Sequence, residues 1–198
     1  MIQEAVLSPT AFRAMLVTTA LECGIQLWEI RNMDQQTINL SGIAWESVVD
    51  GPGLRAVLFA QGCRHGCPGC FNEDLQPFRD AQWYPVNTLM DELKQRPYLD
   101  GVTFSGGDPL EQADAFSTLA AWCQEQALDV WCYTGYRWEE LADDERIQTL
   151  LNHVNVLVDG RYEATNSDRS LMFRGSANQR LIRVQESRQR GQLVLWQT

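Results

Sequence analysis

Polar and apolar residues along this chain alternate in blocks that predict strands followed by helices. Short apolar runs predict core strands at residues 54–59, 100–104, 129–133 and 154–158. Helical periodicity between these runs predicts helices at 86–95, 109–127 and 138–151. Flanking strands are predicted at 37–49, 180–184 and 192–196. Strands that alternate with helices favour an α/β fold with a mostly parallel sheet and right-handed crossovers.

The N-terminal part does not share this pattern. Residues 1–36 have only loose helical periodicity, and no later element calls for their apolar side chains. At 198 residues the chain is long enough for one domain with a sizeable core. We therefore predict an N-terminal extension at 1–36 and one domain at 37–198.

Each predicted core strand is followed by a short segment that contains cysteine, glycine or polar residues. These segments are 63–70, 106–108, 134–136 and 159–161. Ligands of parallel sheets gather at the carboxyl ends of the strands. We therefore expect the four segments to face one site.

The first of these segments is a cysteine loop. Cys63, Cys67 and Cys70 have the spacing C-x3-C-x2-C. Three readings are open: a structural zinc site with His65 or another cysteine as fourth ligand, a ferredoxin-like electron carrier, and a [4Fe-4S] cluster held at three irons. An electron carrier would need a fourth cysteine, whereas the third reading leaves one iron open to a ligand.

The second segment has the residues of a tight turn that leads into a helix. Gly106 and Gly107 permit the turn, Asp108 suits the helix N-cap, and Pro109 suits the first helical position. Glu111 would complete a capping box. Together with the preceding strand, this is a βα unit.

Composition and charge narrow the possible partners. The chain has 16 basic and 26 acidic residues and a net charge of -10, which disfavours nucleic acid or an anionic membrane surface as the main partner. No apolar run reaches the length of a membrane span, and no secretory signal is evident. Six cysteines without an export signal indicate reduced thiols and a cytoplasmic setting. Cys23, Cys123 and Cys132 are expected to be buried apolar residues.

The motifs resemble a known family. The C-x3-C-x2-C loop after one strand and Gly-Gly-Asp-Pro after the next are similar to the radical S-adenosylmethionine (SAM) enzymes. More narrowly, the chain resembles the anaerobic ribonucleotide reductase activating enzymes, whose activity generates a glycyl radical. The segments that carry this resemblance are 49–55, 62–72, 105–110, 133–136, 158–161 and 174–179.

The resemblance implies a fold, two cofactors and a set of ligands. The fold is an incomplete (β/α) barrel of the radical SAM type with a mostly parallel sheet, open along one side. Cys63, Cys67 and Cys70 ligate three irons of a [4Fe-4S] cluster, and SAM binds the fourth. The implied SAM-binding residues are Gly106, Gly107, Asp108, Thr134, Asp159 and Arg161. No side chain beyond the cluster and SAM is implied as catalytic.

The resemblance also implies a reaction and partners. One electron cleaves SAM to methionine and a 5'-deoxyadenosyl radical, which takes a hydrogen atom from a glycine of the large subunit of anaerobic ribonucleotide reductase. A flavodoxin- or ferredoxin-type protein supplies the electron. The alternatives are an activase of another glycyl-radical enzyme, a radical SAM enzyme that modifies a peptide or small molecule, and a non-catalytic iron-sulfur or zinc module.

Two positions depart from the wider superfamily. Gly69 precedes the third cysteine where many radical SAM enzymes have an aromatic residue, an arrangement that the reductase activases share. Arg161 stands where other glycyl-radical activases carry a lysine, and it is either an anion ligand or a solvated loop arginine. His65 is similar to a loop histidine of the activases and is interpreted as structural.

Overall fold

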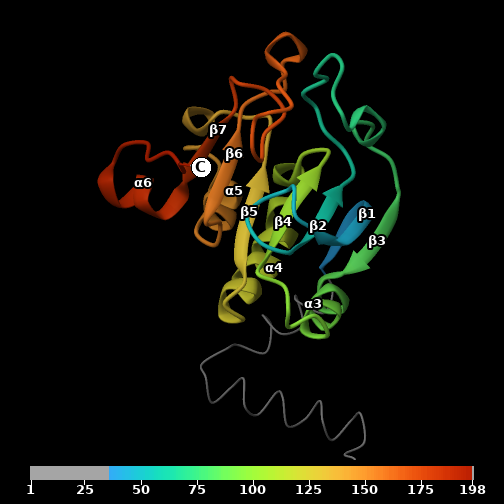
Figure 1. Cartoon of the computed structure of the whole chain (residues 1–198). Helices are drawn as coiled ribbons and strands as arrows, with labels where there is room; N and C mark the ends of the chain where they lie inside the picture. The colour runs from blue at the N-terminus through green and yellow to red at the C-terminus, as the bar shows by residue number, and fades with distance from the viewer. Residues whose placement is uncertain (1–35, 198) are drawn as a thin grey trace, which may run out of the picture. The chain divides into compact units, whose positions relative to one another are not determined.

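The computed structural model describes residues 36–197, which contain one seven-stranded sheet with the order β3-β1-β2-β4-β5-β6-β7 (Figure 1). The strands are β1 (Thr37–Ser47), β2 (Arg55–Ala60), β3 (Gln82–Pro85), β4 (Gly101–Gly106), β5 (Asp129–Tyr133), β6 (Val156–Asp159) and β7 (Arg180–Arg183). The helices are α3 (Val86–Lys94), α4 (Ala113–Glu125), α5 (Glu145–Leu151) and α6 (Val184–Arg190).

The centre of the sheet is parallel and its flanks are antiparallel. Strands β2, β4, β5 and β6 pair in parallel, whereas β1, β3 and β7 each run antiparallel to a neighbour. The edge strands β3 and β7 do not pair with each other in the described part of the chain. The α/β class with a mostly parallel core is therefore confirmed, and the incomplete (β/α) barrel remains a prediction.

Two predicted elements differ from the structure, and two observed elements, β3 and α6, were not predicted. Residues 138–151 are not one helix: a 3-10 turn covers Trp138–Glu140, and α5 begins only after Asp144, whose side chain accepts from two backbone N–H groups as an N-cap. The predicted strand 192–196 is wrong, because the segment is joined to β7 only through an isolated bridge between Leu195 and Ile182. Strand β3 was not predicted, and it pairs with the long β1.

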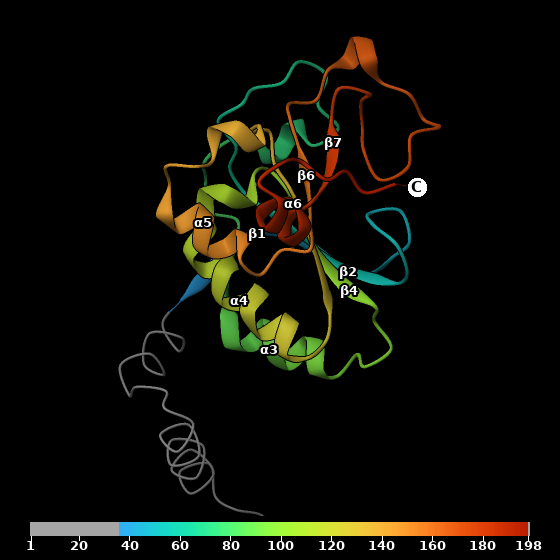
Figure 2. The same cartoon turned by 90° about the vertical axis from the view of Figure 1, so that its left-hand side faces the viewer.

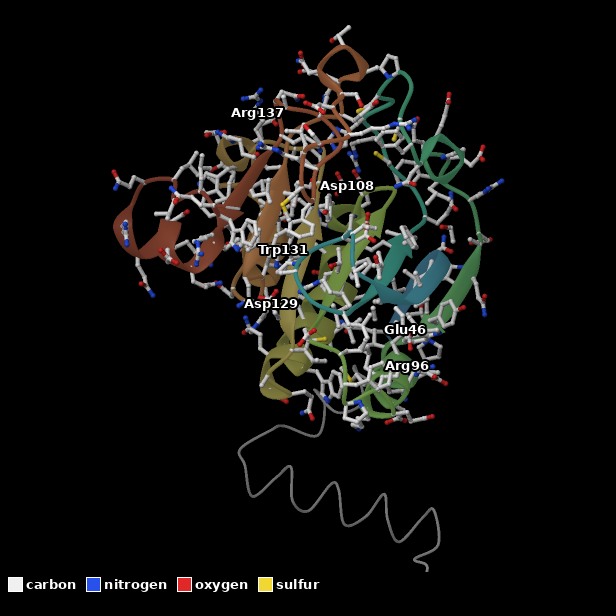
Figure 3. All side chains as sticks on the ribbon, in the orientation of Figure 1. Glu46, Arg96, Asp108, Asp129, Trp131 and Arg137 are labelled. Carbon is white, nitrogen blue, oxygen red and sulfur yellow. The ribbon has the colours of Figure 1, made fainter. Side chains whose placement is uncertain are left out.

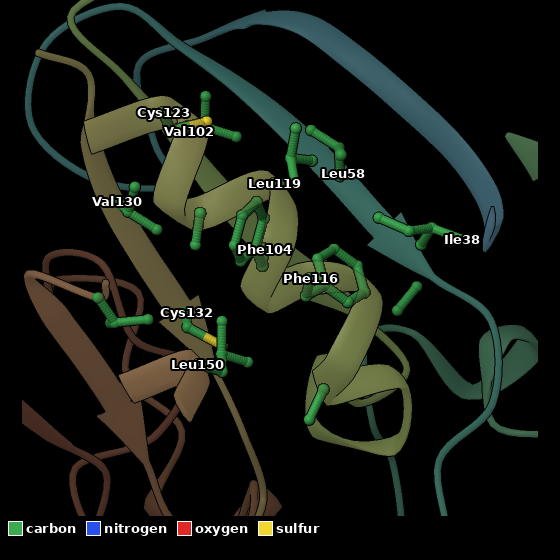
Figure 4. Close-up of a cluster of buried hydrophobic side chains, with 14 of the residues drawn as sticks. Ile38, Leu58, Val102, Phe104, Phe116, Leu119, Cys123, Val130, Cys132 and Leu150 are labelled. Carbon is green, nitrogen blue, oxygen red and sulfur yellow. The ribbon is translucent and has the colours of Figure 1, made fainter. Parts of the chain in front are cut away.

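The main core lies between one face of the sheet and the helices. Alternate residues of the central strands, such as Leu58, Phe104 and Cys132, are fully buried against α3, α4 and α5 (Figure 4). Phe104 of β4 packs on Phe116 of α4 with ring centroids 4.7 Å apart. Figure 2 shows these three helices on the same side of β2 and β4. This side of the sheet therefore carries the main apolar core.

The cysteines outside the loop belong to this core. Cys123 and Cys132 are fully buried, and burial raises the pKa of both thiols. The prediction that they are apolar core residues is confirmed. Cys23 and the predicted extension, apart from Gln36, lie outside the described residues. No helix within 36–197 combines the length and apolar character needed to cross a membrane.

The opposite face of the sheet carries polar groups and two cavities. Because side chains alternate along a strand, Arg55 and Phe59 of β2, and likewise Trp131 and Tyr133 of β5, lie on this face. A cavity of about 540 Å³ lies at the amino ends of the strands. A second cavity, of about 450 Å³, lies at their carboxyl ends.

Arg55 is the charged group buried at the amino ends. Its guanidinium donates to the Thr103 hydroxyl (2.9 Å), the Pro52 and Val102 carbonyls (3.1 and 3.0 Å), and both the carboxylate and the carbonyl of Asp129 (2.9 and 2.7 Å). Trp131 packs against this guanidinium, whose central carbon lies 5.6 Å from the centroid of the Trp131 ring. Figure 3 labels Trp131 and Asp129. All five N–H donors of Arg55 are thus used to hold β2, β4 and β5 together.

We predict that Arg55→Met lowers the free energy of unfolding by about 3 kcal/mol, because it removes a buried guanidinium and leaves the Val102 and Asp129 carbonyl groups without a donor. Urea unfolding of the cluster-free protein measures this. Arg190→Met is the control: Arg190 is exposed on α6, and we expect its loss to change stability by less than about 0.5 kcal/mol. Equal effects of the two substitutions would contradict the structural role of Arg55.

Candidate metal centre

The cavity at the carboxyl ends of the strands brings together residues from four strand ends. Its wall includes the cysteine loop after β2, Gly106 and Gly107 at the end of β4, Thr134 after β5 and Gly160 after β6. Parallel strands place these segments at one edge of the sheet, as the sequence predicts. The structure therefore places the three loop cysteines and the glycine turn around a common space.

The three thiols are half-buried and are each approached by a backbone N–H group. The N–H of Asn72 lies 3.4 Å from Cys70 Sγ. Backbone N–H groups of His65 and Tyr162 interact in the same way with Cys63 and Cys67. Such N–H groups are typical around iron-sulfur ligands, where they stabilise the charge on sulfur.

Burial raises the pKa of two of these thiols, those of Cys63 and Cys67. Desolvation raises the pKa of Cys63 to about 11, and nearby negative groups raise it further. Desolvation also raises the pKa of Cys67. A thiol with the raised pKa of Cys63 keeps its proton near neutral pH, and a bound cationic centre would supply the charge that ionises it. The donor set therefore fits an iron-sulfur cluster, which Cys63, Cys67 and Cys70 would hold.

A site for a single metal ion would require ligand atoms that lie close to one another. One group of possible ligand atoms in the described chain is close enough to hold an ion: those of Cys63, His65 and Asp108 lie within 4.8 Å of one another. Cys67 and Cys70 are not members of this group. Thiolates that bind different irons of a cluster do not need to converge as closely as the ligands of one zinc ion. The arrangement favours a cluster over the zinc alternative.

Backbone hydrogen bonds give the cysteine loop its shape. The N–H of Gly62 donates to the Leu75 carbonyl (2.8 Å), and that of Cys63 donates to the Gln76 carbonyl (2.9 Å). Farther along the loop, the Asn72 amide donates to the carbonyl of Gly106 (3.2 Å). The loop is therefore tied to its own return segment and to the end of β4.

Asp108 connects the cysteine loop to the end of β5. Its carboxylate is fully buried and is hydrogen-bonded to His65 Nε2 (2.8 Å), the Thr134 hydroxyl (2.8 Å) and the backbone N–H groups of Gly135 and Leu110 (both 3.0 Å) (Figure 3). A buried carboxyl group needs such hydrogen-bond partners to offset the cost of its removal from water. The predicted N-cap role of Asp108 is confirmed by the bond from Leu110.

The predicted capping box is wrong. The backbone N–H of Asp108 donates to the Gly62 carbonyl (2.8 Å) and not to the Glu111 side chain. The carboxylate of Glu111 instead pairs with Arg64 and accepts from the Tyr136 hydroxyl (3.2 Å). Glu111 thus forms a second link between the cysteine loop and its surroundings.

The two glycines of the turn are required by close packing. Gly106 has φ +103°, and a Cβ atom there would lie 2.4 Å from the backbone nitrogen of Ala60. A Cβ atom on Gly107 would lie 2.3 Å from the carbonyl oxygen of Gly62. The turn therefore approaches β2 and the cysteine loop more closely than any side chain permits.

Comparisons with known proteins identify the family. A family model described as a 4Fe-4S single cluster domain matches residues 49–182. The anaerobic ribonucleoside-triphosphate reductase-activating protein of enterobacteria phage T4 is 37% identical over 139 residues, which are 67% of this chain and 86% of that protein. The protein of the same name from Escherichia coli K12 is 37% identical over 143 residues, which are 67% and 90% of the two chains.

This chain belongs to the family of anaerobic ribonucleoside-triphosphate reductase-activating proteins. A solved structure, that of QueE from Escherichia coli, aligns with a TM-score of 0.40 and 13% identity over 54% of this chain and 56% of that one. That likeness is too slight to support any conclusion about this member of the family.

The remaining predicted site residues lie in different surroundings. Thr134 lines the cavity, but its hydroxyl donates to Asp108 and accepts from the N–H of Tyr136 (3.2 Å). Asp159 is buried beside the cavity wall, where it pairs with Arg180 (2.9 Å) and accepts from the N–H of Trp138 (2.8 Å). Arg161 is exposed and does not line the cavity. Roles for these three residues in SAM binding remain predictions.

The far wall of the cavity includes Arg174, from the family-like segment 174–179, and residues that the sequence analysis did not single out. Tyr162, Phe173 and Arg174 line it, and Tyr162 packs on Phe71 of the cysteine loop with ring centroids 4.9 Å apart. Tyr133 also lines the cavity from β5. The alternation along β5 could have placed Tyr133, but nothing local predicts that residues 171–175 fold back over the loop.

We predict that Gly135→Ala reduces iron incorporation. The added Cβ would lie 2.3 Å from the His65 ring, so it would push His65 away from Asp108 and loosen the cysteine loop without changing a ligand. Iron and sulfide per chain after anaerobic reconstitution measure this effect. Gly42→Ala is the control, because nothing lies within 4 Å of a Cβ at Gly42. Full iron content in the Gly135→Ala variant would show that the contact is not needed for the cluster.

Proposed function

We propose that this protein is a radical SAM activase that generates the glycyl radical of anaerobic ribonucleotide reductase. The observation that carries the proposal is a cavity at the strand ends with three half-buried cysteines in its wall. The other cysteines of the described residues, Cys123 and Cys132, are buried in the helix-side core and do not line this cavity. Three protein ligands leave one iron of a [4Fe-4S] cluster for an exogenous ligand.

The cofactors supply the radical chemistry. When bound, the reduced cluster supplies one electron that cleaves SAM to methionine and a 5'-deoxyadenosyl radical, which takes a hydrogen atom from a glycine and becomes 5'-deoxyadenosine. We propose that a flavodoxin- or ferredoxin-type protein supplies that electron. The chain itself ligates the cluster, orients SAM and excludes water.

The glycine turn is suited to the amino group of SAM. Gly106 and Gly107 line the cavity with backbone alone, so their peptide groups can accept from an ammonium without interference from a side chain. Asp108 supports this turn from behind, because its carboxylate is already hydrogen-bonded to groups of this chain. In this proposal Asp108 is a positioning residue and the glycine backbone contacts SAM.

A protein partner fits the rim of the cavity. Val49 and Phe71 line the cavity and are nevertheless 72% and 74% exposed. Exposed apolar side chains that surround a cavity often mark a surface that another protein covers. The relatives are named as activators of the anaerobic reductase, which supports the same partner for this chain.

We predict that Cys67→Ala abolishes the formation of 5'-deoxyadenosine, because the cluster loses one of its three protein ligands. The test reconstitutes the protein anaerobically with iron and sulfide, adds dithionite and SAM, and measures 5'-deoxyadenosine by chromatography. Cys123→Ala is the control cysteine and should retain the activity, since its thiol lies in the core. Product from the Cys67→Ala variant would show that the ligands are wrong, and no product from the unmodified protein would favour a non-catalytic module.

We predict that the reduced, SAM-loaded protein produces a glycyl-radical signal in anaerobic ribonucleotide reductase. Electron paramagnetic resonance of the mixture detects this radical directly. A parallel mixture with a formate-lyase-type glycyl-radical enzyme should give no signal. The reverse result would favour the alternative in which this chain activates another glycyl-radical enzyme.

A further inference from the structure

One cationic side chain in the wall of the cavity has no anionic partner. Arg174 is the only arginine or lysine that lines this cavity in the described chain, and it is half-buried. One terminal nitrogen donates to the Gln179 carbonyl (3.0 Å). The Nε atom is buried and has no hydrogen-bond partner. Leaving such a donor unpaired is costly, so the site is arranged for an acceptor that this chain does not provide.

The neighbouring buried charges are all paired within the protein. Asp108 is hydrogen-bonded to His65, Asp159 pairs with Arg180, and Glu111 pairs with Arg64. Asp50, the acidic residue that lines the same cavity, accepts from the Ser47 hydroxyl (2.5 Å). Arg174 therefore differs from these groups: it is a half-buried cation in the cavity wall, and no ion pair joins it to an acidic residue within the described part of the chain.

The backbone before Arg174 is held in an unfavourable conformation. Phe173 has φ +58°, which a bulky residue rarely adopts. The Tyr133 hydroxyl donates to the Phe173 carbonyl (2.8 Å), and the rings of Trp131 and Trp196 pack on the Phe173 ring at 5.4 and 5.7 Å. Backbone strain that the surroundings maintain in this way is concentrated at functional sites.

The backbone after Arg174 is also fixed. The Gln179 side chain accepts from the N–H groups of Gly175 (2.9 Å) and Ser176 (3.1 Å), and it donates to the Gly160 carbonyl (3.1 Å). Gly175 packs closely against two rings: a Cβ atom there would lie 3.1 Å from the Tyr162 ring and 3.2 Å from the Phe71 ring. The backbone on both sides of Arg174 is thus fixed, which lowers the entropy lost on ligand binding.

The geometry points to Arg174 as the residue that binds the carboxylate of the methionine part of SAM. A guanidinium with free donors matches a carboxylate in charge and in shape. This assignment rests on the proposed function and places the anion contact at Arg174 and not at Arg161, which is exposed and does not line the cavity.

The test compares two ligands that differ in the carboxylate alone. SAM and decarboxylated SAM are titrated into anaerobically reconstituted protein, and their dissociation constants are measured by calorimetry. Arg174→Gln should weaken SAM binding roughly ten- to hundredfold, the loss of a charge-assisted hydrogen bond, and leave the affinity for decarboxylated SAM unchanged. Arg169→Gln removes the same charge from an exposed position nearby in the chain and should change neither affinity.

Two further measurements separate a structural effect from a binding effect. Iron per chain and melting temperature should be the same for Arg174→Gln and the unmodified protein. Arg174→Lys, which keeps the charge but loses the fork of donors, should recover part of the SAM affinity and leave the affinity for decarboxylated SAM unchanged.

Three outcomes would overturn the assignment. Equal weakening of both ligands by Arg174→Gln would mean that Arg174 acts on the cluster or the loop, and not on the carboxylate. Unchanged SAM affinity in that variant, or a selective loss in Arg161→Gln instead, would place the anion contact elsewhere. An unmodified protein that binds neither ligand would reject the proposed function itself, which distinguishes that failure from the others.

Discussion

The buried carboxylate of Asp108 is the constraint on which the rest of the site depends. A charge with no solvent exposure must be satisfied by nearby donors, and Asp108 draws them from three separate parts of the chain. His65 brings the cysteine loop, Thr134 and Gly135 bring the end of β5, and Leu110 begins the segment that leads into α4. Loss of any one donor would leave the carboxylate under-satisfied, so these parts are positioned as one unit.

The two faces of the sheet divide stability from chemistry. One face packs against three helices through apolar side chains that alternate along the strands. The other face presents the groups in between, with Arg55 closing the amino ends and the cysteine loop lying at the carboxyl ends. This division explains why Cys132, one residue away from the cavity-lining Tyr133, is an inert core residue.

Features that depend on nearby residues were predictable from the sequence. The central parallel strands, α3, the glycine turn and the cap at Asp108 each have local patterns, and the cysteine spacing is the pattern on which the proposed cluster ligands rest. The break before α5 was missed because the helical periodicity of the sequence continues across Asp144. Only the structure shows that Asp144 is an N-cap at which a new helix begins. The partners of Glu111 and Asp159 were missed for another reason: Arg64 and Arg180 are far from them in sequence, and only the tertiary fold brings each pair together.

The anchoring of the cysteine loop limits how far its motif could be moved to another protein. The carbonyl groups of Leu75 and Gln76, the bare backbone of Gly107 and the carboxylate of Asp108 all contact the loop, yet none belongs to the cysteine motif. A graft of residues 63–70 onto an unrelated scaffold would carry the ligands without the groups that space them. The smallest portable unit is the three neighbouring parallel strands β2, β4 and β5 with the loops that follow them, which is more than the spacing of three cysteines suggests.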